Sequence, residues 1–230
     1  MIQSTNLYLQ YSQTREYALQ DINFIIDSGE LVFFVGESGA GKTSLTRILL
    51  ASQLPSHGSI TIGDFTIDSN STSKSVKLSI RQMVGTVFQD FRLFYGRSVL
   101  ENIYLGLRVI APLTTERKSF CKTLLEKIGL KHKQNQLVDH LSFGERQRIA
   151  IARALARKPK YIIADEPTGN LDQNTAIDIL KLLVNFKDDN TTLLVTTHAT
   201  HLMTEFDRRV IELHQGKLLS DSVLSKGESR

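Results

Sequence analysis

The chain has 230 residues, a mass of 25.9 kDa and 41% apolar residues, which fits one globular domain or one domain with an inserted lobe. Its 28 basic and 24 acidic residues give a net charge of +4, a bias too mild to demand nucleic acid or an anionic membrane as partner. A single cysteine, Cys121, excludes an internal disulfide and a cysteine zinc site and fits a reducing, intracellular setting. The apolar runs are short and the N-terminus lacks the usual pattern, so we expect neither a membrane-crossing helix nor a signal peptide.

The first third of the chain favours strands. Leu31–Val35 is a continuous apolar run of the kind that forms a buried parallel strand, and a helical pattern follows from Thr43 to Ser52. Gly58–Ile67 is typical of a hairpin with Gly63 and Asp64 at its turn. Other strands are predicted for Leu7–Tyr11, Ile22–Ile26 and Met83–Phe88, and the Ser-rich residues 68–79 are interpreted as a surface loop.

From Asp90 to Lys158 the pattern changes to helix, with apolar residues three and four apart. The predicted helices cover Ser98–Leu107 and Glu116–Ile128, and a later one covers Thr175–Phe186; strands return at Tyr161–Ala164, Thr192–Thr196, Val210–Leu213 and Lys217–Leu219. Residues 221–230 are expected to be a flexible tail. Alternating strands and helices predict an α/β fold around a parallel sheet, with a helical lobe inserted at about 90–158.

A phosphate-binding loop is the most specific motif. Gly36–Thr43 fits G-x-x-x-x-G-K-[ST], in which glycines let backbone N–H groups converge on phosphate oxygens at the start of a helix. Lys42 is expected to neutralise the β- and γ-phosphates, and Thr43 to ligate Mg²⁺. The alternative is a plain glycine-rich turn between a strand and a helix.

Two acids, Asp165 and Glu166, end the apolar run Tyr161–Ala164. Ligands of open α/β sheets bind beyond the carboxyl ends of the strands. Asp165 is therefore placed to hold Mg²⁺, and Glu166 to orient or deprotonate the water that attacks the γ-phosphate. With the phosphate loop, this pair indicates a nucleotidase; the alternative is two surface acids that cap a strand.

Ser142 and Glu145 fit a capping box at the start of a helix that runs to about Arg157. Most such boxes only cap a helix. The functional alternative is a second helix N-terminus that receives phosphate.

This set of motifs resembles the ATP-binding-cassette (ABC) ATPases over nearly all of residues 1–220, and Leu141–Glu145 resembles the signature sequence of that family. The resemblance implies a single P-loop NTPase domain over 1–220, with an N-terminal antiparallel β subdomain and an inserted α-helical subdomain. It implies ATP and Mg²⁺ as ligands and ATP hydrolysis. It also implies a dimer, expected to be a homodimer, in which the P-loop of one chain faces the signature sequence of the other.

Further roles carry over from the resemblance. Gln89 resembles the glutamine that senses Mg²⁺ and links to a membrane partner, Asp172 resembles a residue of the loop that communicates across the dimer, and His198 resembles the switch histidine at the γ-phosphate. His198 and His201 are three residues apart, but no nearby acid or thiol completes a zinc set. Contacts with ATP are implied for Gly36, Ser38, Gly39, Ala40, Gly41, Lys42, Thr43, Ser44, Ser142, Gly144 and Glu145.

Tyr11 resembles the aromatic residue that stacks on adenine, with Tyr8 or Tyr17 as weaker candidates and a core aromatic as the alternative. The signature sequence has two departures: Phe143 replaces a glycine, and Glu145 replaces the usual glutamine. Ser142 and Gly144 are kept, so ATP binding across the dimer is expected to survive, and Phe143 is a candidate to alter closure or turnover.

Within the family, Val87–Leu93 most resembles the ATPases of bacterial cell division, while Ala164–Asp172 is shared with lipoprotein-release and macrolide-export ATPases. The resemblance implies a peripheral protein at the cytoplasmic face of the plasma membrane. Its membrane partner would dock near the helical lobe and the region after Gln89 and regulate cell-wall hydrolases. The alternatives are an exporter ATPase, a nucleic-acid-handling ATPase suggested only by the pI of about 9.1, and a non-hydrolysing scaffold; we expect no nucleic acid.

Overall fold

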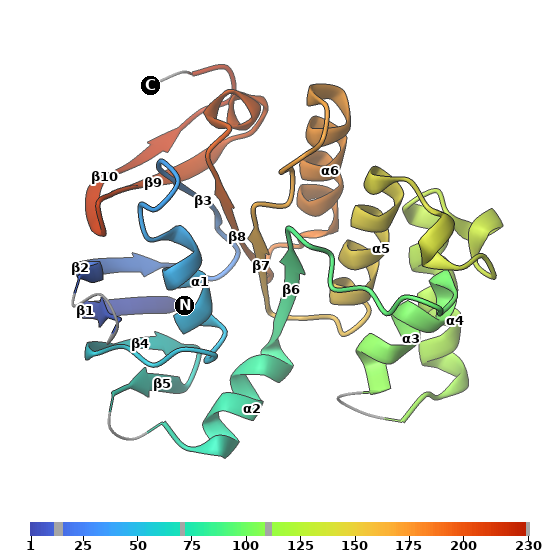
Figure 1. Ribbon diagram of the computed structural model, residues 1–230, viewed down its shortest axis with the longest axis horizontal. Coiled ribbons are helices and arrows are strands. Elements are labelled where there is room, and N and C mark those ends of the chain that lie inside the picture. Colours follow the sequence, from blue (N-terminus) through green and yellow to red (C-terminus); the bar gives the residue numbers. More distant parts are fainter. Residues whose placement is uncertain (12–15, 70–71, 109–111, 229–230) are drawn as a thin grey trace.

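The computed structural model describes residues 1–11, 16–69, 72–108 and 112–228, which form two β-sheets and a group of helices (Figure 1). The smaller sheet is antiparallel, in the order β2-β1-β4-β5. Its strands are β1 (Ile2–Gln10), β2 (Tyr17–Ile26), β4 (His57–Ile62) and β5 (Phe65–Asp68). The hairpin predicted over 58–67 is the β4–β5 pair.

The larger sheet has the order β10-β9-β3-β8-β7-β6, and only β10 runs antiparallel to its neighbour. Its strands are β3 (Leu31–Val35), β6 (Val84–Phe88), β7 (Tyr161–Asp165), β8 (Thr192–Thr197), β9 (Arg208–His214) and β10 (Lys217–Leu224). The parallel core sheet and the antiparallel N-terminal sheet are both confirmed. Because β3 pairs with β8 and β9, the carboxyl ends of distant segments meet beside the phosphate loop.

Two cores form on opposite faces of the large sheet. Phe34 faces the first core, which includes Leu45 and Ile48 of α1 (Lys42–Leu49) and strands of the small sheet. Phe33, the neighbouring residue, faces the second core, which includes Ile149 of α5 (Phe143–Leu155) and residues of α6 (Gln173–Phe186). Successive side chains of a strand point to opposite faces, so a continuous apolar run is needed when both faces are covered.

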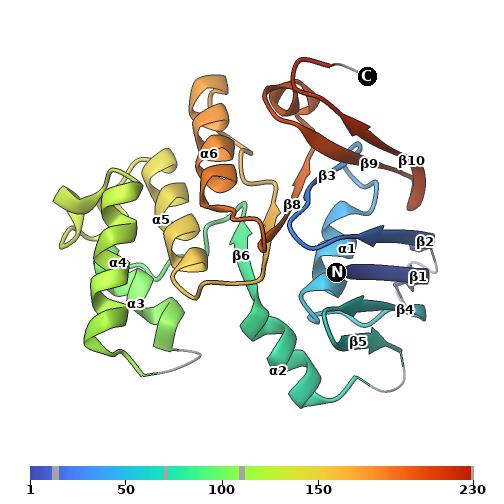
Figure 2. The same cartoon turned by 180° about the vertical axis from the view of Figure 1, so that it is seen from behind.

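The helical lobe lies to one side of the large sheet (Figure 2). It contains α3 (Val99–Arg108), α4 (Thr115–Lys127) and α5, with the short 3-10 helices η1 (Lys131–Lys133) and η2 (Val138–His140) before α5. A third 3-10 helix, η3 (Thr200–Glu205), follows β8. Among the described residues, no helix has both the length and the apolar character that a membrane span requires.

The interpretation of residues 68–79 as a loop is wrong from residue 74 on, because α2 covers Lys74–Met83. The Ser73 hydroxyl caps this helix by accepting a hydrogen bond from the Val76 N–H. Ile80 is buried, and Val76 and Met83 pack against the core between the sheets. An apolar stripe of three residues at helical spacing is therefore enough here, although the segment is mostly polar.

The expectation of a flexible tail from residue 221 is also wrong for the described residues. Asp221–Leu224 belong to β10 and pair with β9. The buried guanidinium of Arg208 then donates to the carbonyls of Ser225 at 3.0 Å and Glu228 at 2.7 Å. Hydrogen bonds to a buried charge hold this segment in place.

Candidate nucleotide site at the ends of the parallel strands

The phosphate loop between β3 and α1 has a backbone that only glycine can adopt at two positions. Gly36 has φ 149°, and a Cβ there would lie 2.2 Å from the Leu213 carbonyl oxygen. Gly41 has φ 107°, and a Cβ there would lie 2.6 Å from the Ala18 carbonyl oxygen. No side chain caps α1 at Gly41, which suits a helix start that receives an anion.

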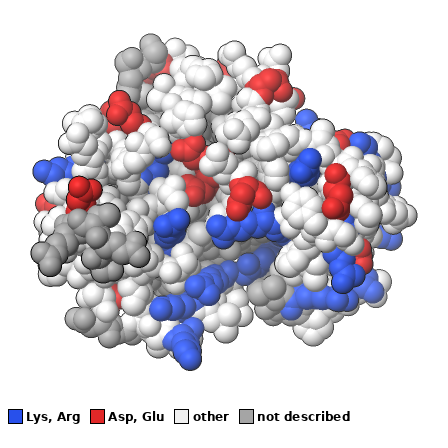
Figure 3. Space-filling view, viewed as in Figure 1, with Lys and Arg blue, Asp and Glu red and all other residues white. Residues whose placement is uncertain are grey.

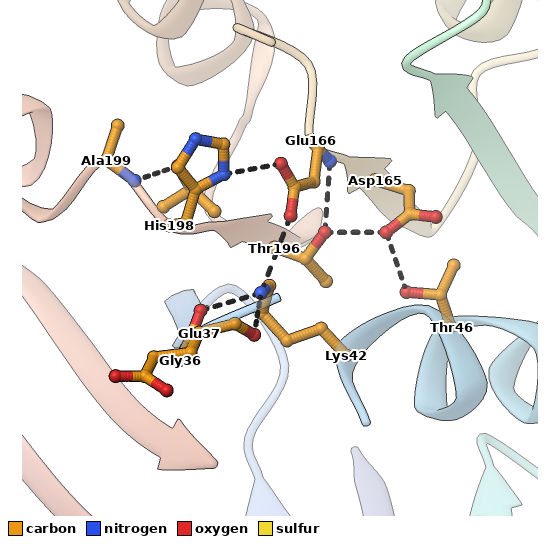
Figure 4. Close-up of polar contacts among 10 residues, drawn as sticks. Gly36, Glu37, Lys42, Thr46, Asp165, Glu166, Thr196, His198 and Ala199 are labelled. Atoms are coloured by element: carbon orange, nitrogen blue, oxygen red, sulfur yellow. Dashed lines mark hydrogen bonds and ion pairs between the residues drawn. The ribbon is translucent and has the colours of Figure 1, made fainter. Parts of the chain in front are cut away.

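Lys42 lies inside this loop with only 4% of its side chain exposed. Its Nζ donates to the carbonyl oxygens of Gly36 at 2.7 Å and Glu37 at 3.0 Å, and it lies 3.5 Å from Glu166 Oε1 (Figure 4). A buried ammonium needs such partners. Lys42 thus lies between the phosphate loop and the carboxylate of Glu166, the residue that follows β7.

Glu166 follows β7 in a left-handed conformation, with φ 48°. Its N–H donates to the Thr196 carbonyl at 3.1 Å and to the Thr196 hydroxyl at 3.0 Å. Its Oε2 lies 2.7 Å from His198 Nδ1, and because a carboxylate only accepts, the histidine nitrogen donates. A strained backbone held by several contacts is typical of functional positions.

Asp165 points away from Glu166, toward the start of α1. Its Oδ1 accepts from the Thr196 hydroxyl at 2.7 Å and the Thr46 hydroxyl at 3.4 Å. Burial, together with the neighbouring Glu166 charge, raises the pKa of Asp165 above its usual value. The sequence prediction named neither Thr196 nor Thr46; a threonine at the end of the apolar strand β8 was the available signal.

A cavity of about 720 Å³ opens beside these groups, within the size range of small-ligand sites. Gln89, at the end of β6, packs against Gly169, where a Cβ would lie 2.9 Å from the Gln89 amide nitrogen. The structure thus brings together predicted site residues from four separate segments. The cavity is lined by Gly36, Ser38, Thr43, Gln89, Glu166 and His198, among others.

The oxygen donors beside the phosphate loop are of the kinds that bind Mg²⁺. Thr43 lines both this cavity and a neighbouring one that Asp165 also lines. Hydroxyl, carboxylate and amide oxygens are the ligands this ion prefers, and it usually takes only one or two carboxylates together with substrate phosphates. The described residues contain no group of three His, Cys, Asp or Glu that would hold a metal by themselves.

Tyr11 is the predicted tyrosine that contacts the phosphate-loop helix. Its hydroxyl lies 3.1 Å from Ser44 Oγ, and its ring packs partly buried against the core between the sheets. Tyr8 instead lies against Tyr17 and His57 on the small sheet. This placement favours Tyr11 among the three candidates for the adenine side of the site.

The predicted signature turn lies in a different cavity. Ser142, Phe143, Gly144 and Glu145 line it together with Asn170, Leu171 and Asp172, and none of these lines the phosphate-loop cavity. The capping box is confirmed: Glu145 Oε2 accepts from the Ser142 N–H at 3.0 Å, and Ser142 Oγ accepts from the Glu145 N–H at 3.3 Å. One chain alone therefore does not bring its signature turn to its own P-loop.

Asp172 caps α6, because its carboxylate accepts from the Thr175 N–H at 3.0 Å, and hydrogen bonds from Thr175 lower the pKa of Asp172. A capping role and a role at a dimer contact are compatible, since Asp172 lines the signature cavity.

Two contacts tie the signature turn to the nucleotide site, and neither was expected from sequence. The Phe143 ring meets the Phe91 ring edge-on, with centroids 4.4 Å apart, two residues beyond Gln89. Gln147 of α5 is buried and donates to the Pro167 carbonyl at 2.8 Å, directly after Glu166. The segments that follow β6 and β7 thus both touch the first turns of α5.

Comparisons with known proteins agree with this geometry. The model of the ABC transporter family matches residues 19–169. The cell division ATP-binding protein FtsE of Mycobacterium tuberculosis is 42% identical over 96% of this chain and 95% of its own length, and that of Bacillus subtilis is 35% identical over 99% and 98%. Methionine import ATP-binding protein MetN 2 of Bacillus cereus is 39% identical over 90% of this chain but 61% of its own length.

Among solved structures, the ATP-binding cassette MJ0796, a dimer in a post-hydrolysis state bound to ADP and Pi, has a TM-score of 0.85 and 30% identity, with both chains fully covered. The fold, the phosphate loop and the matched family model lead to one assignment. The chain belongs to the ABC transporter family and is an ATP-binding ATPase of the ABC type.

Proposed function

We propose that this chain is the ATP-hydrolysing subunit of an FtsE-like complex, which moves an FtsX-like membrane protein and so regulates peptidoglycan hydrolysis in cell division. The similarity to FtsE relatives over nearly their whole length supports this biological role. The observation that carries the chemistry is the Glu166 carboxylate, held between Lys42 and His198 at the wall of the phosphate-loop cavity.

In the proposed reaction, the γ-phosphate takes the place of the Gly36 and Glu37 carbonyls as the partner of Lys42. Glu166 accepts a proton from the attacking water, and His198 holds the Glu166 carboxylate in position and is proposed to contact the γ-phosphate. When bound, Mg²⁺ neutralises charge on the β- and γ-phosphates, with Thr43, Asp165 and Gln89 as its proposed protein contacts.

Two chains are proposed to complete each site. The signature cavity and the phosphate-loop cavity share no lining residue, and we propose that the signature turn serves the ATP bound by a second copy. The dimeric form of the MJ0796 cassette supports this arrangement. In the proposed dimer of this chain, Ser142 and Gly144 receive the γ-phosphate at the N-terminus of α5, and Asp172 lies at the contact between the chains.

The membrane partner is proposed to dock in a basic cleft formed by α1, α2, β6 and the end of α5. This cleft is the neighbouring cavity that Thr43 and Asp165 also line. Its other lining residues include Arg47, Arg81, Arg92, Arg157 and Phe88, which precedes Gln89. Lys and Arg side chains gather across the middle of this face of the molecule (Figure 3). Charge complementarity favours a cytosolic segment of the partner that carries acidic residues, at the cytoplasmic face of the plasma membrane.

Capture of the partner tests the biological role. The Glu166→Gln chain is loaded with ATP in its native cells and recovered from detergent-solubilised membranes, with and without Arg47→Glu. Arg47 is an exposed residue of the cleft, and Lys74→Glu on α2, outside the cleft lining, is the matched control. We expect an FtsX-like protein with the parent and with the Lys74→Glu control, and its loss with Arg47→Glu.

Recovery of a lipoprotein-release, macrolide-export or methionine-import permease would keep the ATP site and overturn the cell-division role. Recovery of no membrane protein would overturn the docking proposal and favour an ATPase that works away from membranes.

A further inference from the structure

The signature turn carries an acid, Glu145, next to Gly144, the glycine that is proposed to bind phosphate. Glu145 Oε2 lies 3.0 Å from the Ser142 backbone nitrogen, so the carboxylate occupies the same helix start that is proposed to receive a γ-phosphate. Carboxylate and phosphate are both anions, so they repel each other when both lie at one helix start. A chain with Glu145 at this position therefore needs a cation close by.

Lys133 of η1 is that cation. Its Nζ lies 2.5 Å from Glu145 Oε1, on the carboxylate oxygen that does not cap the helix. Both side chains are about three-quarters buried, with 27% and 24% exposed, so solvent screens the pair less than an exposed one. Partial burial alone would raise the pKa of Glu145, but the hydrogen bonds from Lys133 and the Ser142 N–H lower it, so the carboxyl stays ionised.

Other cations near the cavity are engaged elsewhere or do not touch Glu145. Arg148 lines the cavity, but its guanidinium lies 4.0 Å from Asp178 of α6. Lys131, on the same short helix as Lys133, pairs with Glu126 of α4. Among these cations, Lys133 is thus the one that pairs with the Glu145 carboxylate of the signature turn.

We propose that Lys133 is a positioning residue for the composite ATP site: it neutralises Glu145, so that the signature turn of one chain can accept the γ-phosphate of ATP bound by the other. This inference rests on the proposed head-to-tail dimer. It assigns Lys133 no contact with the reacting atoms. Its effect is expected on closure of the dimer and not on nucleotide binding by the separate chain, whose phosphate loop lies in another cavity.

The test uses light scattering to measure the ATP concentration at which half of the protein is dimeric. All variants are made in the Glu166→Gln chain, which is the parent. Lys133→Met is expected to raise it roughly fivefold to tenfold, the size of one partly buried ion pair or slightly more. Lys131→Met, which removes the same charge from the same helix, is expected to change it less than about twofold. Lys133→Arg is expected to restore the parent value, and added salt to shrink the Lys133→Met defect.

A second parent chain, which also carries Glu145→Gln, separates an electrostatic role of Lys133 from a structural one. With Glu145→Gln present, adding Lys133→Met is expected to change the half-maximal ATP concentration less than about twofold, because there is no charge left to neutralise. An unchanged melting temperature of the nucleotide-free Lys133→Met chain, and unchanged binding of a fluorescent ATP analogue to the monomer, support the proposal.

Each other result counts against it. If the Lys133→Met chain dimerises like its parent, the inference is overturned. The same holds if the defect persists in full with Glu145→Gln. Either result leaves the dimer proposal unaffected. Poor folding of Lys133→Met with no rescue by Lys133→Arg also overturns it. If the parent Glu166→Gln chain stays monomeric at saturating ATP, the proposed dimer fails and the inference fails with it.

Discussion

Thr196 holds two neighbouring acids in different orientations. Its hydroxyl donates to Asp165 Oδ1 at 2.7 Å and accepts from the Glu166 N–H at 3.0 Å, so one small side chain contacts both the proposed Mg²⁺ ligand and the proposed general base. The charge of Asp165 is opposed by burial and by the neighbouring charge of Glu166. In its proposed role as an Mg²⁺ ligand, Asp165 would lower the stability of the free chain in exchange for cation binding.

Asp165→Asn is therefore expected to stabilise the nucleotide-free chain while it impairs hydrolysis. The pKa of Asp165 is raised in the folded state, so the folded chain holds this proton more tightly than the unfolded one, and ionisation costs stability at neutral pH. The gain should be a few tenths to about 1 kcal/mol at pH 7 and should shrink as the pH falls through the raised pKa toward 3.8. Urea unfolding at several pH values measures it; a loss of stability at pH 7 would contradict this explanation.

The phosphate loop could be predicted from sequence because its chemistry is local: Gly36 and Gly41 are needed by the backbone itself. Asp165 and Glu166 could be placed at a strand end for the same reason. Thr196 could not, because its role depends on β8 lying beside β7, and strand order is a tertiary property. The roles of Gln89, Asp172 and His198 came from the family resemblance and stay proposals.

At the scale of elements, α5 connects the signature turn with the segments that follow β6 and β7. Phe143, which replaces a glycine of the family pattern, packs on Phe91, and the carbonyl oxygens of Phe91 and Arg92 in turn accept from the Arg153 guanidinium. Phe91 and Arg92 both have positive φ, at 56° and 47°, so this loop is held in an unusual shape. The aromatic pair is one of the contacts that fixes it.

Phe143→Ala is expected to lower the free energy of unfolding by about 1–2 kcal/mol, because a half-buried ring loses its packing and its edge-on aromatic partner. Phe94→Ala makes the same change at a ring that is 52% exposed, and should cost less than about 0.5 kcal/mol. Chemical denaturation of the three proteins measures both. Equal losses for the two variants would show that the Phe91–Phe143 contact is not specific.

Helix α2 shows where element prediction fell short. Ser73 is a capping residue, and the apolar residues Val76, Ile80 and Met83 have helical spacing. The serines and lysines around them nevertheless favoured the prediction of a loop. The continuously apolar strand β3 was placed at its observed bounds and the long helix α6 within two residues, since extensive burial leaves a clear pattern in the sequence.

At the scale of the molecule, the C-terminal segment closes one edge of the large sheet. Arg209 bridges Asp221 at 2.7 Å and Glu30 at 3.0 Å, and Arg208 binds the carbonyls of Ser225 and Glu228. One face of β10 is exposed and the other is only half-buried, so the strand has no buried apolar face, which explains why the sequence suggested a frayed end.

Truncation after Ser220 is expected to destabilise the chain by about 3 kcal/mol or more, because it leaves the buried Arg208 without those carbonyls and removes the Asp221 partner of Arg209. Truncation after Glu228 keeps these partners and is the control. Thermal unfolding of the two proteins compares them. A chain ending at Ser220 that melts at the same temperature as the control would contradict this explanation and favour a flexible tail.

The most direct test of ATP hydrolysis at this site is the turnover of Glu166→Gln, measured as phosphate release with ATP binding followed in the same samples. Loss of a general base should lower turnover by roughly 10²–10⁴-fold while ATP is still bound, and the variant should accumulate as an ATP-dependent dimer. A variant that hydrolyses ATP at the rate of the unmodified chain would contradict the role of Glu166 and the geometry built around it.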